Sequence, residues 1–150
     1  MPEDLTVDPF EPSTKWSAGA IRIASRTVNA DEISERLGLV PDEQYERGSL
    51  TNPRNPSSPR YDSNLWIRKS GLGSDADLVE HVVALVRLAG GRRDQLRLLS
   101  ADCDFELFLG FSGDGQGGCV LPARLLAEIG ALGFDAVLDL YPPEPEVTGG

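Results

Sequence analysis

The chain has 150 residues, of which 40% are hydrophobic and 25% are charged, which is an ordinary composition for a globular protein. Its formal net charge of -10 argues against nucleic-acid binding, because phosphate recognition needs a basic surface. No apolar run approaches the roughly 18 residues of a membrane span, and the acidic start lacks the features of a signal peptide, so we expect a cytoplasmic protein without membrane contact.

The first half of the chain predicts one strand, one helix and a long loop. Residues 1–15 are acidic and proline-bearing, and we expect a flexible tail there, before a single globular domain over residues 16–141. Alternating apolar and basic residues predict a strand from Ala18 to Val28. Asn29 and Gly38 are typical caps for a helix between them. Residues 41–63 lack periodicity, which predicts a surface loop that is either mobile or functional.

The second half predicts four strands and two helices. A short strand is predicted over residues 64–67. A strand tryptophan is more often part of the core than a ligand platform, but if Leu65 and Ile67 face the core, Trp66 faces the other side. The longest helix runs from Ser74 to the glycine pair at 90–91, and a later helix covers residues 122–132. Further strands are predicted over residues 95–99, with Leu96 and Leu98 inward, and over 104–111 and 134–141. The proline-rich residues 142–150 should form a flexible C-terminal tail.

This order, β-α-β-α-β-β-α-β, favours an α+β fold. We expect a mixed or antiparallel sheet of about five strands with helices mainly on one face. A ferredoxin-like α/β sandwich is the natural candidate.

Several short motifs together resemble one family. They are Asp31-Glu-Ile-Ser34 in the first helix, Leu37-Gly-Leu-Val-Pro41 after it, Gly48, Trp66 in its strand, and the ending from Leu125 to Tyr141. This combination resembles the uncharacterised bacterial family called domain of unknown function 4279, over roughly residues 18–141. The resemblance implies no established activity and no transferable catalytic residues. It implies a small stand-alone protein of the sort that includes immunity proteins.

A glycine-rich segment, residues 112–118, matches the G-x-G-x-x-G pattern of dinucleotide sites through Gly113, Gly115 and Gly118. A dinucleotide site begins its helix inside the motif, whereas here three residues intervene before Pro122. The residues before the motif also look like paired strands rather than the first strand of a parallel sheet. We therefore interpret the segment as a flexible hairpin or crossover loop and expect no cofactor.

Three carboxylates form the other cluster. Asp102, Asp104 and Glu106 recur at a period of two along one side of a strand and could hold a hard cation such as Mg²⁺. Charge on the solvent side of an edge strand is the commoner arrangement. His81 is the single histidine, and Cys103 and Cys119 are scattered, so no zinc or catalytic pattern emerges. We predict no metal site and no catalytic residue.

An outward Trp66 beside Arg68 would form the kind of anchor that binding sites use. The candidate partner- or ligand-binding residues are therefore Trp66, Arg68, Asp102, Asp104 and Glu106. Our first hypothesis is a non-enzymatic binding module, an immunity-type inhibitor that meets a basic protein with an acidic face. The second is a small-ligand sensor with a pocket around Trp66 and the 112–118 loop. The third is a metal-dependent enzyme that uses the three carboxylates.

Overall fold

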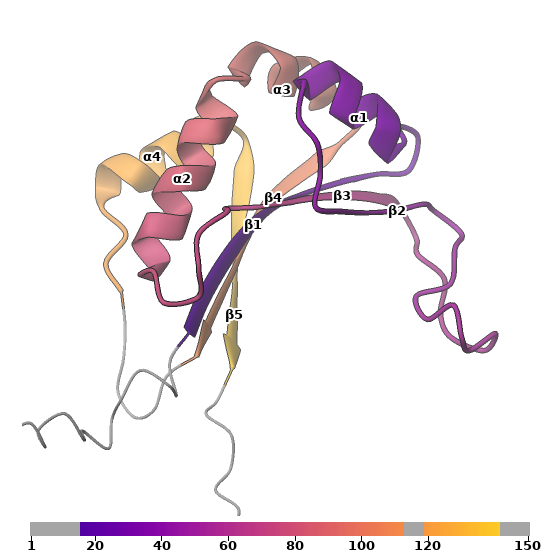
Figure 1. Ribbon diagram of the computed structural model, residues 1–150. Helices are drawn as coiled ribbons and strands as arrows, with labels where there is room; N and C mark the ends of the chain where they lie inside the picture. The colour runs from indigo at the N-terminus through magenta and orange to yellow at the C-terminus, as the bar shows by residue number, and fades with distance from the viewer. Residues whose placement is uncertain (1–15, 113–118, 142–150) are drawn as a thin grey trace, which may run out of the picture.

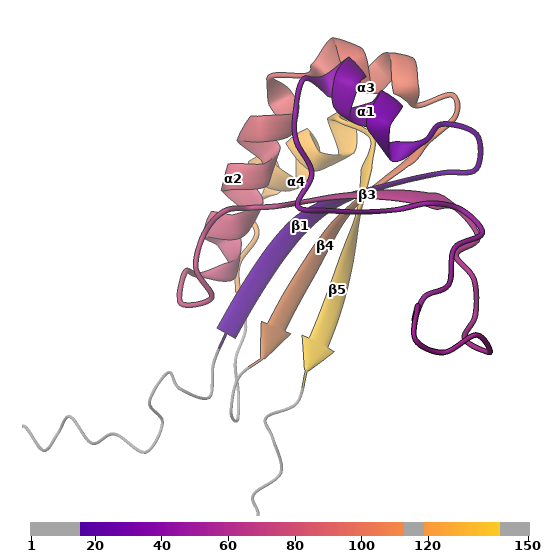
Figure 2. The same ribbon diagram turned by 45° about the vertical axis from the view of Figure 1, so that its right-hand side comes forward.

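The computed structural model describes residues 16–112 and 119–141. In this part of the chain a five-stranded sheet carries four helices, all on one face (Figures 1 and 2). The expected α+β class with a mixed sheet is therefore confirmed. The two expected tails and the three glycines at 113, 115 and 118 lie outside the described residues.

The sheet has the strand order β2-β3-β1-β4-β5. Its strands are β1 (Trp16–Ser25), β2 (Glu43–Tyr45), β3 (Asn64–Lys69), β4 (Asp104–Ser112) and β5 (Phe134–Tyr141). All neighbours are antiparallel except β4 and β5, which are parallel because a helix crosses over between them. The ferredoxin-like order is not confirmed.

The helices are α1 (Ala30–Leu37), α2 (Leu78–Gly90), α3 (Arg93–Leu99) and α4 (Ala123–Ala131). The predicted caps of α1 are confirmed. The Oδ1 atom of Asn29 accepts a 2.9 Å hydrogen bond from the backbone N–H of Glu32, and Gly38 ends the helix in the left-handed region at φ 67°. None of the described helices is long and apolar enough to cross a membrane.

The core lies between the sheet and its helices. Ile21 and Ile23 of β1 and Leu107 and Leu109 of β4 face the helices and are buried, as the strand alternation predicts. Helix α2 crosses β1 at Gly19, where an added Cβ would lie 2.9 Å from the Cβ of His81. This glycine therefore allows the helix and the strand to approach closely.

Two predictions about secondary structure are wrong. Residues 95–99 belong to helix α3 and not to a strand. Leu96 and Leu99, three residues apart, are buried, whereas Leu98 is 73% exposed. The prediction of a loop over residues 41–63 also missed the short edge strand β2.

The rest of that loop is an arm that projects from the sheet (Figure 1). Its two sides are held by backbone hydrogen bonds, including 2.9 Å bonds from Gly48 N–H to the carbonyl of Tyr61 and from Tyr61 N–H to the carbonyl of Ser49. The rings of Tyr45 and Tyr61 stack at its base, with centroids 4.7 Å apart. These contacts give the arm a defined shape.

Candidate functional site on the open face of the sheet

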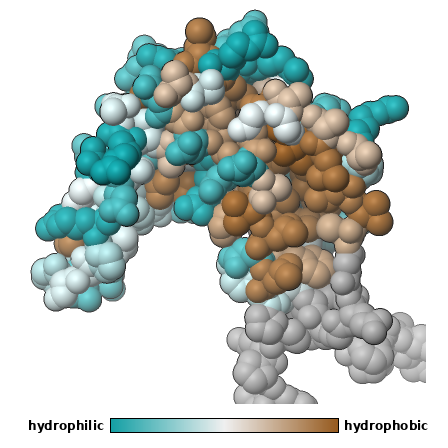
Figure 3. Space-filling model, turned by 180° about the vertical axis from the view of Figure 1, so that it is seen from behind, coloured by the Kyte–Doolittle hydropathy of each residue, from teal (hydrophilic) through white to brown (hydrophobic). Residues whose placement is uncertain are grey.

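One face of the sheet carries no helix among the described residues. Ala18, Ala20 and Arg22 of β1 point to this open face, because the residues that alternate with them are buried under the helices. The pairing of β4 with β1 brings Phe108 and Gly110 to the same face. Seen from behind, the molecule also presents a broad hydrophobic area (Figure 3), and several of its large exposed apolar side chains belong to β5 and the α4 region. Monomeric proteins rarely leave large apolar areas open, so the open face and the neighbouring β5 edge are the first places to look for binding.

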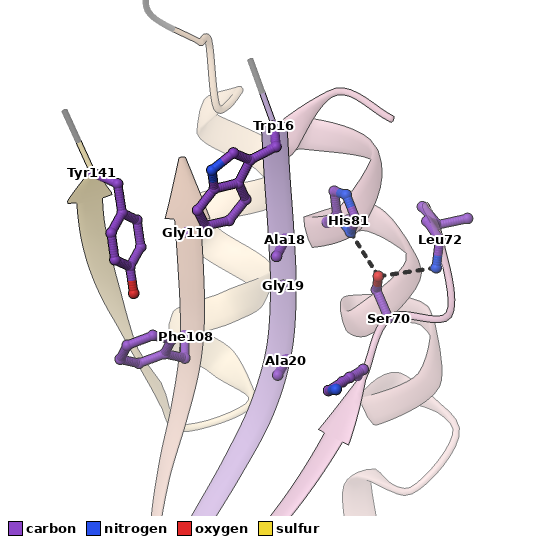
Figure 4. Close-up of a pocket in the computed structure, with 11 residues that line it drawn as sticks. Trp16, Ala18, Gly19, Ala20, Ser70, Leu72, His81, Phe108, Gly110 and Tyr141 are labelled. Carbon is purple, nitrogen blue, oxygen red and sulfur yellow. Dashed lines mark hydrogen bonds between the residues drawn. The ribbon is translucent and has the colours of Figure 1, made fainter. Parts of the chain in front are cut away.

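A pocket of about 210 Å³ opens beside β1 on this face (Figure 4). Three aromatic side chains, Trp16, Phe108 and Tyr141, line it together with small residues of β1 and β4. Its other end is formed by Lys69, Ser70, Leu72 and His81. The volume is below the roughly 300–1,000 Å³ of typical ligand sites, so the pocket suits a small molecule or one inserted side chain.

Trp16 and Tyr141 form the aromatic wall of this pocket. Their ring centroids are 5.1 Å apart and their planes are tilted by 39°. Gly110 lies beneath the indole, and an added Cβ at this glycine would come within 3.0 Å of the Trp16 ring. Figure 4 shows Trp16 leaning from β1 across β4 toward Tyr141 on β5. Because glycine has no side chain, position 110 leaves room for the Trp16 ring to pack over β4.

His81 is buried at 1% exposure, and its Nδ1 atom lies 2.6 Å from the Oγ atom of Ser70. The Ser70 Oγ also accepts a 3.2 Å hydrogen bond from the Leu72 N–H. The Nε2 atom of His81 has no hydrogen-bond partner among the described residues. A serine–histidine pair works as a nucleophile when a third group orients the ring, and that group is missing here within the described part of the chain. Sequence reasoning missed this pair because Ser70 lies in an irregular segment.

The structure places Trp66 in the core, which is the commoner position of a strand tryptophan, so the alternative in which it faces away from the core is wrong. Its side chain is 0% exposed, and its Nε1 atom donates a 2.9 Å hydrogen bond to the Oγ atom of Ser34. Arg68, on the same side of β3, donates a 2.8 Å hydrogen bond to the carbonyl oxygen of Val40. Both side chains support the packing of α1 and the segment after it, and neither lies on the open face.

The carboxylates divide differently from the prediction. Asp104 and Glu106 lie on the open face of β4, whereas Asp102 belongs to the turn before the strand. The parallel pairing of β5 then places Asp135 beside Glu106 and Asp139 beside Gly110. Four carboxylates, Asp104, Glu106, Asp135 and Asp139, therefore form an acidic row along β4 and β5. Sequence reasoning missed the β5 members because the register between the two strands was unknown.

Among the described residues, the acidic row included, no group of three or more histidine, cysteine, aspartate or glutamate side chains is placed to hold a metal ion. None of the row's four members forms an ion pair with another described residue. Asp139 accepts a hydrogen bond from the Tyr141 hydroxyl, and this bond raises the pKa of Tyr141 above its ordinary value. The row therefore presents its negative charge outward.

An exposed apolar strip lies along the edge strand β5. Leu138 pairs with the buried Leu109 and therefore lies on the helix-facing side of the sheet, and Leu140 pairs with Phe111 on the same side. Both leucines are nevertheless open, at 56% and 67% exposure, because the helices do not extend over this end of β5. Val120 and Leu126 of the α4 region are also exposed. No described strand pairs with the outer side of β5.

Two arguments from the sequence speak against a dinucleotide site at residues 113–118: the pairing of the strands before the motif and the spacing between the motif and the next helix. The argument from strand pairing is wrong, because β4 and β5 are parallel. The argument from spacing is confirmed, because α4 begins only at Ala123. The motif itself lies outside the described residues.

Comparison with known proteins identifies a family. A family model described as "Domain of unknown function (DUF4279)" matches residues 14–143, which is most of the chain. No curated protein and no solved structure matches.

Proposed function

The chain belongs to the DUF4279 family, whose description assigns no activity, and we propose that it is a non-enzymatic binding module for a basic partner protein. The specific form that we propose is an immunity-type inhibitor, which covers a functional surface of that partner. The observation that carries the proposal is the acidic row of Asp104, Glu106, Asp135 and Asp139 on the open face, which meets the exposed leucines of the helix-facing side at the edge strand β5. Protein interfaces usually combine apolar contacts with polar and charged ones.

The open face also carries basic residues. Lys69 is 3.4 Å from a carboxylate oxygen of Glu43. Arg22 lies opposite Glu106 in the pairing of β1 with β4, but it forms no described ion pair with it, and its guanidinium lies 4.8 Å from the Phe108 ring centroid. The carboxylates of the row have no such partner among the described residues. Together with the net charge of -10, they create a field that attracts a cationic surface.

The experiment is a capture assay with the purified protein on lysate from its host, at about 50 mM and 500 mM salt, because salt screens attraction between surface charges. One variant, called the row variant, removes three of the four charges of the row through Glu106→Gln, Asp135→Asn and Asp139→Asn. A matched control carries Glu35→Gln, Glu46→Gln and Asp94→Asn, which make the same charge change at other exposed sites.

We expect the native protein and the control to capture a basic protein at low salt and to lose it at high salt. The row variant should not capture it. Equal capture by the row variant and the control, or capture of no basic protein, would contradict the proposal.

The pocket at Trp16 favours a second candidate, a small-ligand sensor. Its volume of about 210 Å³ and its aromatic lining suit a small apolar molecule. This pocket lies away from Trp66, where the sequence placed it. A thermal-shift panel of small aromatic and aliphatic acids tests the candidate, with Ala20→Leu to fill the pocket and Ala131→Leu as an exposed control. A shift that the first variant abolishes and the second retains would support the sensor.

A further inference from the structure

The outer edge of β5 has the features of a strand-addition site. The strand is eight residues long, contains no proline and leaves its outer backbone groups without a described partner. Natural edge strands are usually short, covered or interrupted to prevent pairing with other chains. The opposite edge of this sheet follows that rule, because β2 has only three residues. The β5 edge does not follow it.

The two faces of β5 differ in chemistry. On the helix-facing side, Ala136, Leu138 and Leu140 are exposed. On the open face, Asp135 and Asp139 are four residues apart, with the partly exposed Val137 between them, and the two carboxylates continue the acidic row of β4. Successive side chains of an added strand point to opposite faces. A strand paired with β5 would therefore place alternate residues against leucines and carboxylates.

From this arrangement we propose that the partner binds as an extended segment that pairs with the outer edge of β5 and alternates basic with apolar residues. The basic side chains lie on the open face near Asp135 and Asp139, and the apolar ones lie against Leu138 and Leu140. Main-chain hydrogen bonds supply affinity and the alternation supplies specificity, as in other strand-addition complexes. This inference rests on the proposed function and adds the partner's chemistry and its mode of binding.

A second copy of the chain is a poorer occupant for the same edge. Antiparallel pairing of two β5 strands would join the two acidic rows on one continuous face. Like charges that face each other across a sheet are destabilising, and each copy also carries a net charge of -10. A basic segment removes this repulsion.

The test uses short synthetic peptides and the full-length protein. The probe alternates lysine with valine or leucine, and a control peptide of the same composition groups its lysines together. We expect the alternating peptide to bind at least about tenfold more tightly than the grouped one, a difference of about 1.4 kcal/mol. Equal affinities, or no binding by the alternating peptide, would overturn the inference.

Backbone pairing is tested by N-methylation, which removes an amide donor and blocks the edge. Two versions of the alternating peptide carry methyl groups on alternate amides, one set in each version. Because only alternate amides of an added strand face its neighbour, one version should lose binding and the other should keep it. Equal behaviour of the two versions would show contact through side chains alone and would overturn the strand-addition mode.

Protein variants separate this inference from the proposed function. Leu138→Lys should weaken peptide binding at least about tenfold, whereas Leu98→Lys, at an exposed leucine of α3, should leave it unchanged. If Leu138→Lys still captures the basic host protein while the row variant fails, the proposed function stands and the β5 edge is excluded. If the row variant also captures it, the proposed function fails. Light scattering that shows a dimer dissociated by Leu138→Lys would assign the edge to a second copy and overturn the inference.

Discussion

The indole Nε1 atom of Trp66 donates a 2.9 Å hydrogen bond to the Oγ atom of Ser34, which joins the core of β3 to helix α1. Trp66 is the largest fully buried side chain of the described core. Among the described residues, the Ser34 Oγ atom is the hydrogen-bond acceptor of its indole N–H group. A buried tryptophan needs such a partner, because an unsatisfied donor in an apolar interior is costly. Ser34 therefore makes it favourable to bury the whole ring.

Ser34→Ala removes that acceptor. We expect the free energy of unfolding to fall by about 1–3 kcal/mol, because the indole N–H remains buried without a partner. Denaturant unfolding followed by tryptophan fluorescence measures the change. Glu35→Ala, at the exposed neighbouring position of α1, is the control and should change stability by less than about 0.5 kcal/mol. Equal stabilities of the two variants would show that the bond contributes nothing.

The sequence predicted the elements with long or capped patterns and missed those that depend on pairing. Helix α1 has its caps in the sequence, and β4 has an apolar alternation along its length. Strand β3 is short, and both of its sides carry apolar residues: Leu65 and Ile67 on one side and Trp66 on the other. Alternation therefore could not show which side is buried. At residues 95–99, two alternating leucines suggested a strand, but a third leucine at position 99 completes a helical face.

The candidate site was harder to predict for a related reason. Trp16, Phe108 and Tyr141 come together only because β1, β4 and β5 are neighbours in a particular register. The acidic row likewise depends on Glu106 lying beside Asp135. Register follows from the packing of the entire sheet, so local patterns do not contain it.

Gly19 should not tolerate a side chain. In Gly19→Ala, the new methyl group would lie 2.9 Å from the Cβ of His81 and 3.2 Å from a methyl carbon of Leu85, so α2 must move away from β1. We expect a loss of about 1–3 kcal/mol, which is typical of overpacked cores.

Gly130→Ala is the matched control, because an added Cβ there meets nothing within 4 Å. Alanine favours the helical conformation, so this variant should gain about 0.5–1 kcal/mol. Thermal unfolding of both variants measures the difference, and a stabilising Gly19→Ala would mean that the interface between α2 and β1 is looser than described.

The two cysteines should differ in reactivity. Cys119 is exposed and Cys103 is buried, and burial raises the pKa of the Cys103 thiol, although a hydrogen bond with Ser25 acts in the opposite direction. With a thiol reagent at about pH 8, close to the ordinary thiol pKa, we expect rapid labelling of Cys119 and labelling of Cys103 only after unfolding. Mass spectrometry of the labelled peptides identifies each site.

The same pKa shift makes stability depend on pH. The folded pKa of Cys103 is above the unfolded value, so its contribution is complete below the unfolded pKa and is lost as pH rises through the folded one. We expect the free energy of unfolding to decline above pH ~8.5. Cys103→Ala should reduce the decline and Cys119→Ala should retain it. An unchanged decline in Cys103→Ala would assign it to other groups.

Asn64 anchors the base of the projecting arm. Its Nδ2 atom donates a 3.1 Å hydrogen bond to the Val28 carbonyl, and its Oδ1 atom accepts a 2.8 Å bond from the Arg47 N–H. Asn64→Ala should reduce the free energy of unfolding by about 1–3 kcal/mol, because two backbone groups lose their partner. Asn55→Ala, within the exposed arm, should have little effect. Hydrogen exchange at Arg47 should quicken in the first variant only.

The position of β1 sets the order in which the chain can fold. This strand is made early, yet it lies at the centre of the sheet between β3 and β4. Its contacts with β4 begin only at Asp104, so a ribosome must complete most of the chain before both sides of β1 are paired. Until then β1 can pair only with β3, and its other edge stays open to chaperones or to neighbouring chains. Native pairing on both sides of β1 therefore becomes possible only once β4 has been made.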